Sequence, residues 1–244
     1  MQNSEIVFNS LYIDQVYDKL LDAISFGDLK PGERVRQSKL AERLGVSRQP
    51  ISHALQLLKH QGLVRDAGKQ GVQVAPLDGA YINQLYMVRS VLEDKAARMA
   101  VGRVHGGGAR QQEVDTLNDA LLAGQKALRA NAVRPELVRA DYQFHLALYR
   151  LSGNPVIEQV MTGLWPHIMR SMLAVLEYGD QDAAAVAWDE HAKITAHIIT
   201  GNADLAAAAC SMHLQRASGD LCRKLEQLNR LPEGAVDVSG AGQA

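Results

Sequence analysis

The sequence predicts a mainly α-helical protein with a small mixed region at the N-terminus and a larger all-helical region after it. Apolar residues recur at helical spacing along most of the chain, and the short apolar pieces that suit strands lie before residue 75. The composition, 47% hydrophobic and 22% charged over 244 residues, is that of a globular protein with one large or two modest domains.

The N-terminal region carries three helical patterns separated by glycines. The first pattern stops at Gly27, and a second, shorter pattern ends at Gly45. Ser47 is placed to cap a third helix over residues 47–60, with Pro50 in its first turn, where a missing N–H costs little. The apolar positions that define these helices are Ile13, Val16, Leu20, Ile24, Leu40, Leu44, Ile51, Ala54, Leu55 and Leu58.

A β-hairpin is expected after the third helix, because the apolar pieces 63–64 and 72–74 flank Gly68 and Gly71. Three helices followed by a hairpin is the order of a winged helix-turn-helix. Residues 1–78 are therefore predicted to form such a domain.

Six more helices are expected beyond a linker at residues 75–79. Glycine, asparagine and proline separate them, and the short connections predict an antiparallel helical bundle. The expected spans are 80–104, 110–130, 134–151, 155–178, 181–200 and 203–229. Residues 79–231 are predicted to form this second domain, and the end of the chain, 232–244, is rich in glycine and small residues and is predicted to be a disordered tail.

The sequence argues against a membrane or secreted protein. No apolar run approaches the roughly 20 residues needed to cross a bilayer, and the N-terminus lacks the features of a signal peptide. Cys210 and Cys222 lie in one helical stretch, about 18 Å apart along its axis, which is too far for a disulfide. We therefore expect a cytoplasmic protein with reduced thiols and no membrane partner.

A formal net charge of −1 hides an uneven distribution. Residues 34–71 carry eight basic and two acidic residues, a local net of +6, whereas residues 1–33 have a net charge of −4. The basic segment coincides with the second and third predicted helices and the hairpin. A local positive excess of this kind is typical of a surface that binds nucleic acid.

The polar face of the 47–60 helix suits the reading of DNA. Arg48, Gln49, Ser52, His53 and Gln56 lie opposite its apolar positions. Arginine can pair with guanine and glutamine with adenine. An ordinary solvated face is the alternative that periodicity alone favours, but the local charge and the hairpin favour DNA binding.

Residues 16–74 resemble the DNA-binding domain of GntR-family transcriptional regulators over their whole length, particularly in LKPGERV, LAERLGVSR, GLV and the last glycine of the hairpin. The resemblance implies that Arg48 opens a recognition helix on the operator and that Gly71 lets the wing backbone approach the minor groove. Ser52-His53 stands where the family commonly has Arg-Glu, which leaves the operator sequence open. The predicted DNA-binding residues are Arg36, Ser47, Arg48, Gln49, Ser52, His53, Lys69 and Gly71.

Four residues of the helical region have spacings that suit one metal ion. Asp141 and His145 share a helix face at i, i+4, and His191 and His213 lie 11 residues to either side of Asn202, where a helical hairpin would bring them together. One carboxylate and three imidazoles suit Zn²⁺, Ni²⁺, Fe²⁺ or Mn²⁺. Chance spacing among eight histidines is the alternative reading.

Residues 80–229 also resemble the FCD effector domain of FadR-type GntR regulators, in VRSVLEDKAARMA, DYQFHLALYRLSGNP and EHAKITAHIITGNADLAAAACSMHL. The resemblance implies a divalent metal ion as cofactor. The residues at the family's ligand positions are Asp141, His145, His191 and His213. An ion with open coordination positions would accept a small carboxylate effector. Arg89, Arg170 and His167 are candidates for effector binding, with structural ion pairs as the alternative for the two arginines.

The sequence therefore predicts a ligand-responsive transcriptional regulator and not an enzyme. We expect a homodimer that binds double-stranded operator DNA, represses, and is released by a small organic acid at the metal site. One alternative is a regulator for which the metal ion itself is the signal. Another is a metal-dependent hydrolase, for which the chain has no His-Glu-x-x-His, Gly-x-Ser-x-Gly or phosphate-loop motif.

Overall fold

The computed structural model describes residues 2–68, 71–177 and 181–230. Contacts divide the chain into two compact units, Met1–Leu77 with Val160–Leu173, and Asp78–Gln159 with Ala174–Ala244. The sequence did not predict that residues 160–173 join the N-terminal unit. The domain limits at 78 and 231 stay predictions, and the expected tail, 232–244, lies outside the described residues.

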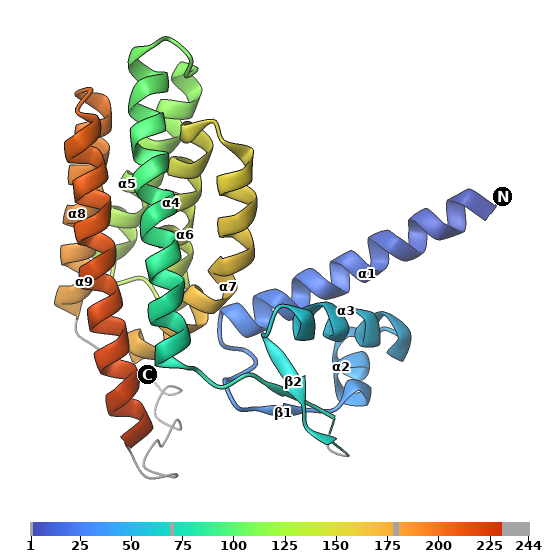
Figure 1. Cartoon of the computed structure of the whole chain (residues 1–244). Helices are drawn as coiled ribbons and strands as arrows, with labels where there is room; N and C mark the ends of the chain where they lie inside the picture. The colour runs from blue at the N-terminus through green and yellow to red at the C-terminus, as the bar shows by residue number, and fades with distance from the viewer. Residues whose placement is uncertain (1, 69–70, 178–180, 231–244) are drawn as a thin grey trace. The chain divides into compact units, whose positions relative to one another are not determined.

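The first unit has the predicted order of helices with a small sheet (Figure 1). Its helices are α1 (Gln2–Ser25), α2 (Gln37–Leu44) and α3 (Arg48–His60), and its strands are β1 (Arg34–Val35), β2 (Val64–Asp66) and β3 (Val72–Val74). Strand β3 lies between β1 and β2 and is antiparallel to both, so the expected hairpin is part of a three-stranded sheet.

A continuous apolar core holds these elements together. It contains the inward positions of α1 and α3, including Ile24, Ile51 and Leu58, together with Val64 and Val74 from the sheet. Ser47 is the N-cap residue of α3, but its side chain makes no capping hydrogen bond. The prediction of the cap position was right, whereas the expected side-chain cap was wrong, since the extended Ser47 backbone alone begins the helix.

Gly71 has a structural reason to be glycine. Its φ of +94° lies in the left-handed region, and a Cβ built there would lie 2.6 Å from the carbonyl oxygen of Val35 in β1. Gly68 also has a positive φ, +60°, but a Cβ there would meet nothing within 4 Å. A side chain at Gly68 would therefore add backbone strain alone, whereas a side chain at Gly71 would add backbone strain and a steric clash with β1.

We expect Gly71→Ala to lower the free energy of unfolding by about 2–3 kcal/mol, because it combines backbone strain with a forced shift of β1. Gly68→Ala, which adds the strain alone, should cost about 1 kcal/mol. Chemical denaturation of both variants checks this difference. An equal decrease in the free energy of unfolding in both variants would show that the contact with Val35 does not affect stability.

The second unit is a helical bundle whose helices match the predicted spans to within one residue at every end. They are α4 (Gly79–His105), α5 (Gln111–Arg129), α6 (Arg134–Ser152), α8 (Gln181–Ile199) and α9 (Ala203–Arg230), and α7 (Pro155–Glu177) contributes its two ends. Glycines with positive φ, Gly153 and Gly201, stand where α6 and α8 end. In the described part of the chain, no helix is both long and apolar enough to cross a membrane.

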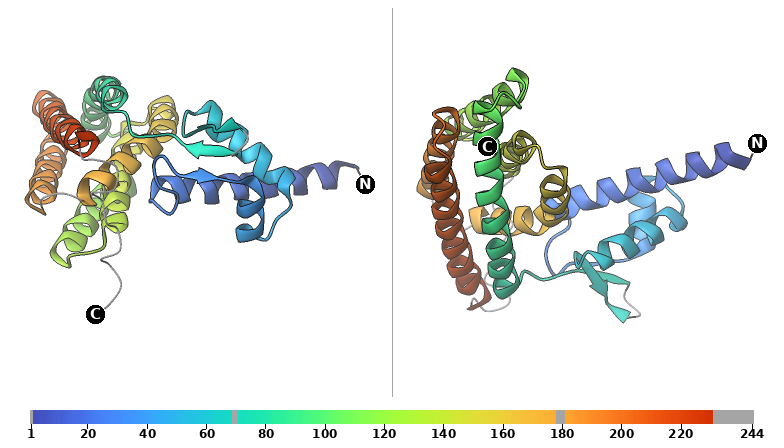
Figure 2. Two further views of the ribbon diagram at one scale, coloured as in Figure 1. Left: turned by 90° about the horizontal axis from the view of Figure 1, so that it is seen from below. Right: turned by 45° about the horizontal axis from the view of Figure 1, so that its top comes forward.

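Contacts between α4 and α9 are the most extensive in this bundle, and the two helices run side by side in Figures 1 and 2. The pair is antiparallel, since Arg98 contacts Asp204 near one end and Ser218 contacts Asn83 near the other. Helix α4 also packs against α6 and α8, and α8 packs against α9. The faces of α6, α8 and α9 that point inward consequently share one interior. Both cysteines, Cys210 and Cys222, are free thiols.

Candidate metal centre and DNA-binding surface

The four predicted metal ligands come together inside the second unit. Asp141 and His145 come from α6, His191 from α8 and His213 from α9. All four are buried, and the two histidines His145 and His191 have no exposed surface. Helical spacing explains the first pair, and the short turn at residues 200–202 explains why α8 and α9 present their histidines to one another.

Nitrogens of the three histidines converge, and the carboxylate of Asp141 lies beside two of them. Nε2 of His191 lies 3.2 Å from Nε2 of His213 and 3.6 Å from Oδ1 of Asp141, and Nε2 of His145 lies 3.9 Å from Oδ2 of Asp141. One ligand nitrogen from each histidine lies within 4.8 Å of the others. Two nitrogens bound to one tetrahedral zinc ion are about 3.4 Å apart, because each Zn–N bond is about 2.1 Å. The donor set and its spacing therefore fit a divalent metal ion.

A second layer of carboxylates holds two of the histidines. Nδ1 of His145 lies 3.0 Å from Oε2 of Glu93, and Nδ1 of His213 donates to Oε2 of Glu190 at 2.7 Å. Metal-binding histidines commonly give their other N–H to a carboxylate, which orients the ring and directs the lone pair of Nε2 to the ion. Both glutamates therefore strengthen the fit to a metal centre.

Burial favours the neutral form of His145 and His191, which is the form that binds a metal ion. Desolvation lowers the pKa of His145, although the nearby Glu93 opposes this, and it places the pKa of His191 well below its usual value. Burial raises the pKa of Glu190, but hydrogen bonds from His213 and Arg216 outweigh this effect and lower the pKa to about 2. The site thus offers the neutral imidazoles of His145 and His191, with the ionised carboxylate of Glu190 at its edge.

Arg89 contacts Glu93, the carboxylate that lies beside His145. Its Nε donates to Oε1 of Glu93 at 2.7 Å, and the hydroxyl of Tyr149 donates to the same oxygen at 2.5 Å. Arg89 and Glu93 are both almost completely buried. This contact gives Arg89 a structural role in positioning Glu93, and its predicted role in effector binding stays a prediction.

His167 and Arg170 lie in the segment of α7 that belongs to the first unit. Nε2 of His167 is 2.9 Å from the carbonyl oxygen of Gln61, and Nη2 of Arg170 donates to the carbonyl oxygen of Ala75. Burial lowers the pKa of Arg170 to about 10. Each residue thus has a structural contact within the first unit, and their predicted role in effector binding stays a prediction.

Aromatic side chains close the interior around His191. Phe144 stacks on its ring at a centroid distance of 4.2 Å, and Trp188 meets it edge-on at 4.8 Å. Helix α5 approaches this layer at Gly124, where an added Cβ would lie 1.8 Å from Cη2 of Trp188. Gly124 therefore allows the indole to occupy its place beside the histidine.

We expect Gly124→Ala to lower the free energy of unfolding by about 1–3 kcal/mol, because the added methyl group overpacks the interior against Trp188. Gly219 in α9 is the matched control, since a Cβ there meets nothing within 4 Å. Gly219→Ala should be neutral or stabilise the protein by up to about 1 kcal/mol. Thermal unfolding measures both changes, and an equally stable Gly124→Ala variant would contradict the packing described here.

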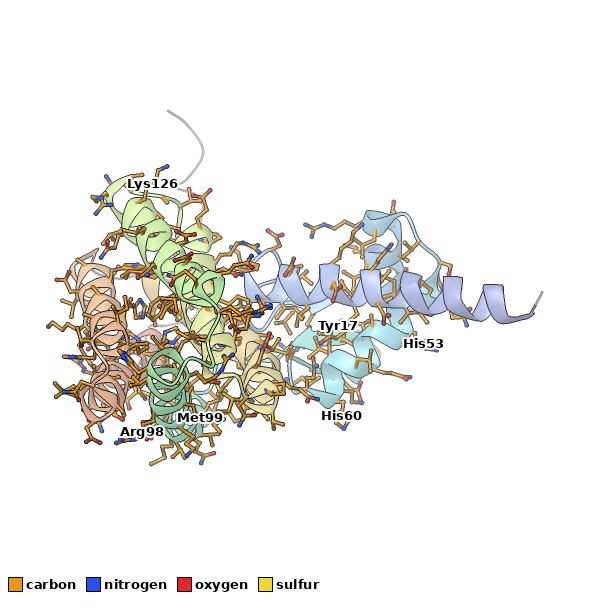
Figure 3. All side chains as sticks on the ribbon, turned by 90° about the horizontal axis from the view of Figure 1, so that it is seen from above. Tyr17, His53, His60, Arg98, Met99 and Lys126 are labelled. Carbon is orange, nitrogen blue, oxygen red and sulfur yellow. The ribbon has the colours of Figure 1, made fainter. Side chains whose placement is uncertain are left out.

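The predicted DNA-reading residues form an exposed surface on the first unit. Arg48 opens α3, and Arg48, Gln49 and His53 are exposed whereas Ser52 is half-buried; His53 is labelled in Figure 3. Helix α3 contains no acidic residue. Two further residues of the predicted set precede helices: Arg36 is the N-cap residue of α2, and Ser47 is the N-cap residue of α3. Both are exposed. Gly71 lies in the wing, and Lys69 lies outside the described residues.

Comparisons with known proteins match both regions. Residues 12–74 match the family described as bacterial regulatory proteins, gntR family, and residues 84–216 match the FCD domain. The uncharacterized HTH-type transcriptional regulator YdhC of Bacillus subtilis is 26% identical over 88% of this chain and 93% of its own length. The Nta operon transcriptional regulator of Aminobacter aminovorans is 28% identical over 88% of this chain and 92% of its own.

A solved structure supports the fold. Escherichia coli McbR/YncC superimposes with a TM-score of 0.76 over 89% of this chain and 99% of that chain, at 22% identity. The matched families and relatives are transcriptional regulators and not enzymes. The chain therefore belongs to the GntR family of bacterial regulatory proteins and is a DNA-binding transcriptional regulator whose DNA-binding domain is followed by an FCD effector domain.

Proposed function

We propose that this regulator is a homodimeric repressor that holds a divalent metal ion in its FCD domain and leaves its operator when a small organic acid binds there. The observation that carries the proposal is the convergence of one nitrogen from each of three buried imidazoles, with the carboxylate of Asp141 beside two of them and carboxylate partners behind two of the rings. Such a donor set suits Zn²⁺, Ni²⁺, Fe²⁺ or Mn²⁺.

Each residue has a defined part in this proposal. Asp141, His145, His191 and His213 would hold the ion, while Glu93 and Glu190 keep the rings of His145 and His213 oriented. A bound ion with open coordination positions supplies a Lewis-acidic point that attracts a carboxylate oxygen. Arg89 stays a candidate for direct contact with the acid, although its Nε already donates to Glu93.

On the DNA side, α3 supplies the base-reading surface and the basic segment supplies phosphate contacts. A twofold-symmetric dimer presents two such helices to a pseudo-palindromic operator. Because effector and operator binding are linked, an acid that favours a different arrangement of the dimer weakens DNA binding by the same factor that DNA weakens acid binding. A regulator of this kind acts in the cytoplasm, where bacterial DNA is found.

A thermal-shift screen of metal-loaded protein tests the effector class. We expect a small carboxylate from a panel of acetate, lactate, malonate, succinate and citrate to raise the melting temperature, since a ligand that binds only the folded state stabilises it. Sugars and amines of similar size should have no effect. No shift with any acid would contradict the carboxylate assignment.

The alternative that the ion itself is the signal has a direct test in operator binding. If chelator-treated protein loses its operator affinity and Zn²⁺ restores it with no acid present, the ion is the effector. If the metal stays bound and only the acid changes operator affinity, the ion is a cofactor. The buried donor set favours tight retention and hence the second result.

A further inference from the structure

Glu190 receives several short hydrogen bonds at the edge of the histidine cluster. Nδ1 of His213 donates to Oε2 at 2.7 Å, while Arg216 donates from Nε to Oε1 and from Nη2 to Oε2, both at 2.7 Å. Nη1 of Arg216 donates to Oδ2 of Asp220 at 3.0 Å. The guanidinium group of Arg216 therefore binds the Glu190 carboxylate in a bidentate manner and also contacts the carboxylate of Asp220.

The charge on Glu190 determines where the proton of His213 lies. An ionised carboxylate can only accept hydrogen bonds, so the contact at Nδ1 requires the proton to be on that nitrogen. In a neutral ring the lone pair is then on Nε2, which faces Nε2 of His191. Resting on the proposed metal site, we infer that Glu190, clamped by Arg216, is a positioning residue that holds the His213 ring in its metal-binding tautomer.

The corresponding residue for His145 is unsuitable for testing this idea. Glu93 has no exposed surface, and its removal would leave the buried Arg89 without its carboxylate. Glu190 and Arg216 differ because their side chains are 19% and 27% exposed. Removal of the Glu190 carboxylate leaves Arg216 with water and Asp220 as partners, so a Glu190 variant can fold.

The first test measures Zn²⁺ affinity by competition with a chromophoric chelator. We expect Glu190→Ala to weaken Zn²⁺ binding by about 10- to 100-fold, the usual effect of losing an outer carboxylate. Glu190→Gln keeps an oxygen acceptor and should give an intermediate affinity. Asp189→Ala is the control, because it removes the same charge from an exposed neighbour on α8 and should leave the affinity unchanged.

The second test reads the tautomer directly by nitrogen-15 NMR of histidine-labelled, metal-free protein. The His213 proton should be on Nδ1 in the wild type and in Glu190→Gln, and it should lose this preference in Glu190→Ala. Failure of the wild type to bind Zn²⁺ would overturn the proposed metal site together with this inference. Wild-type binding combined with an unchanged affinity or an unchanged tautomer in Glu190→Ala would overturn the inference alone.

Discussion

His213→Ala is expected to weaken binding of a divalent ion by roughly 100-fold, since one of four ligands contributes about 3 kcal/mol of the total of about 10–16 kcal/mol typical of a structural zinc site. Nε2 of His213 lies 3.2 Å from Nε2 of His191, so its loss opens the cluster on the α9 side. Isothermal titration of chelator-treated protein with Zn²⁺ measures the change.

The same variant should lose most of the stabilisation that metal gives the wild type. A free metal concentration about a thousand times the dissociation constant stabilises the folded state by about 4 kcal/mol. His197→Ala is the control, because His197 lies on α8 outside the cluster. If His213→Ala gains as much stability from Zn²⁺ as the His197→Ala control does, the ion is bound elsewhere and the proposed site is wrong.

Arg48→Ala is expected to weaken operator binding by about 10- to 100-fold, as loss of an arginine that pairs with a base costs about 1–3 kcal/mol. Arg48 is exposed at the first position of α3, so its removal leaves the core of the first unit intact. Fluorescence anisotropy with labelled promoter DNA measures the affinity, and thermal unfolding checks that the variant is folded.

Lys19→Ala serves as the charge-matched control for Arg48→Ala, because Lys19 is an exposed residue of α1 in the same unit. Its loss should change operator affinity far less. The response of Arg48→Ala to metal should equal that of the wild type, since the metal ligands belong to the second unit. Equal losses of operator affinity in the two variants would show that α3 contributes only general charge and does not read the operator.

Much of the fold follows from local signals in the sequence. Helices α6 and α8 end close to glycines that adopt positive φ, Gly153 and Gly201, and this is why the ends of their predicted spans agree with the structure. The approach of His191 to His213 follows from equal spacing around Asn202. Strand β1 was not predicted, because a strand of two residues has too short a pattern to detect.

The carboxylates behind the cluster could not be predicted in the same way. Glu190 reaches His213 because of how α8 crosses α9, which no spacing within one helix determines. The approach of Glu93 to His145 depends on the packing of α4 against α6. The place of His167 and Arg170 in the first unit likewise depends on packing, which sequence alone did not reveal.

The most direct test of the central proposal is one anisotropy titration of operator DNA with metal-loaded wild type and with Asp141→Ala, each with and without a carboxylate that passes the thermal-shift screen. We expect the acid to weaken operator binding of the wild type by about 5- to 150-fold, the usual range of coupling between two sites, and to leave the variant unchanged. Identical operator affinities with and without acid in the wild type, or an equal acid response in Asp141→Ala, would contradict control of DNA binding through the metal centre.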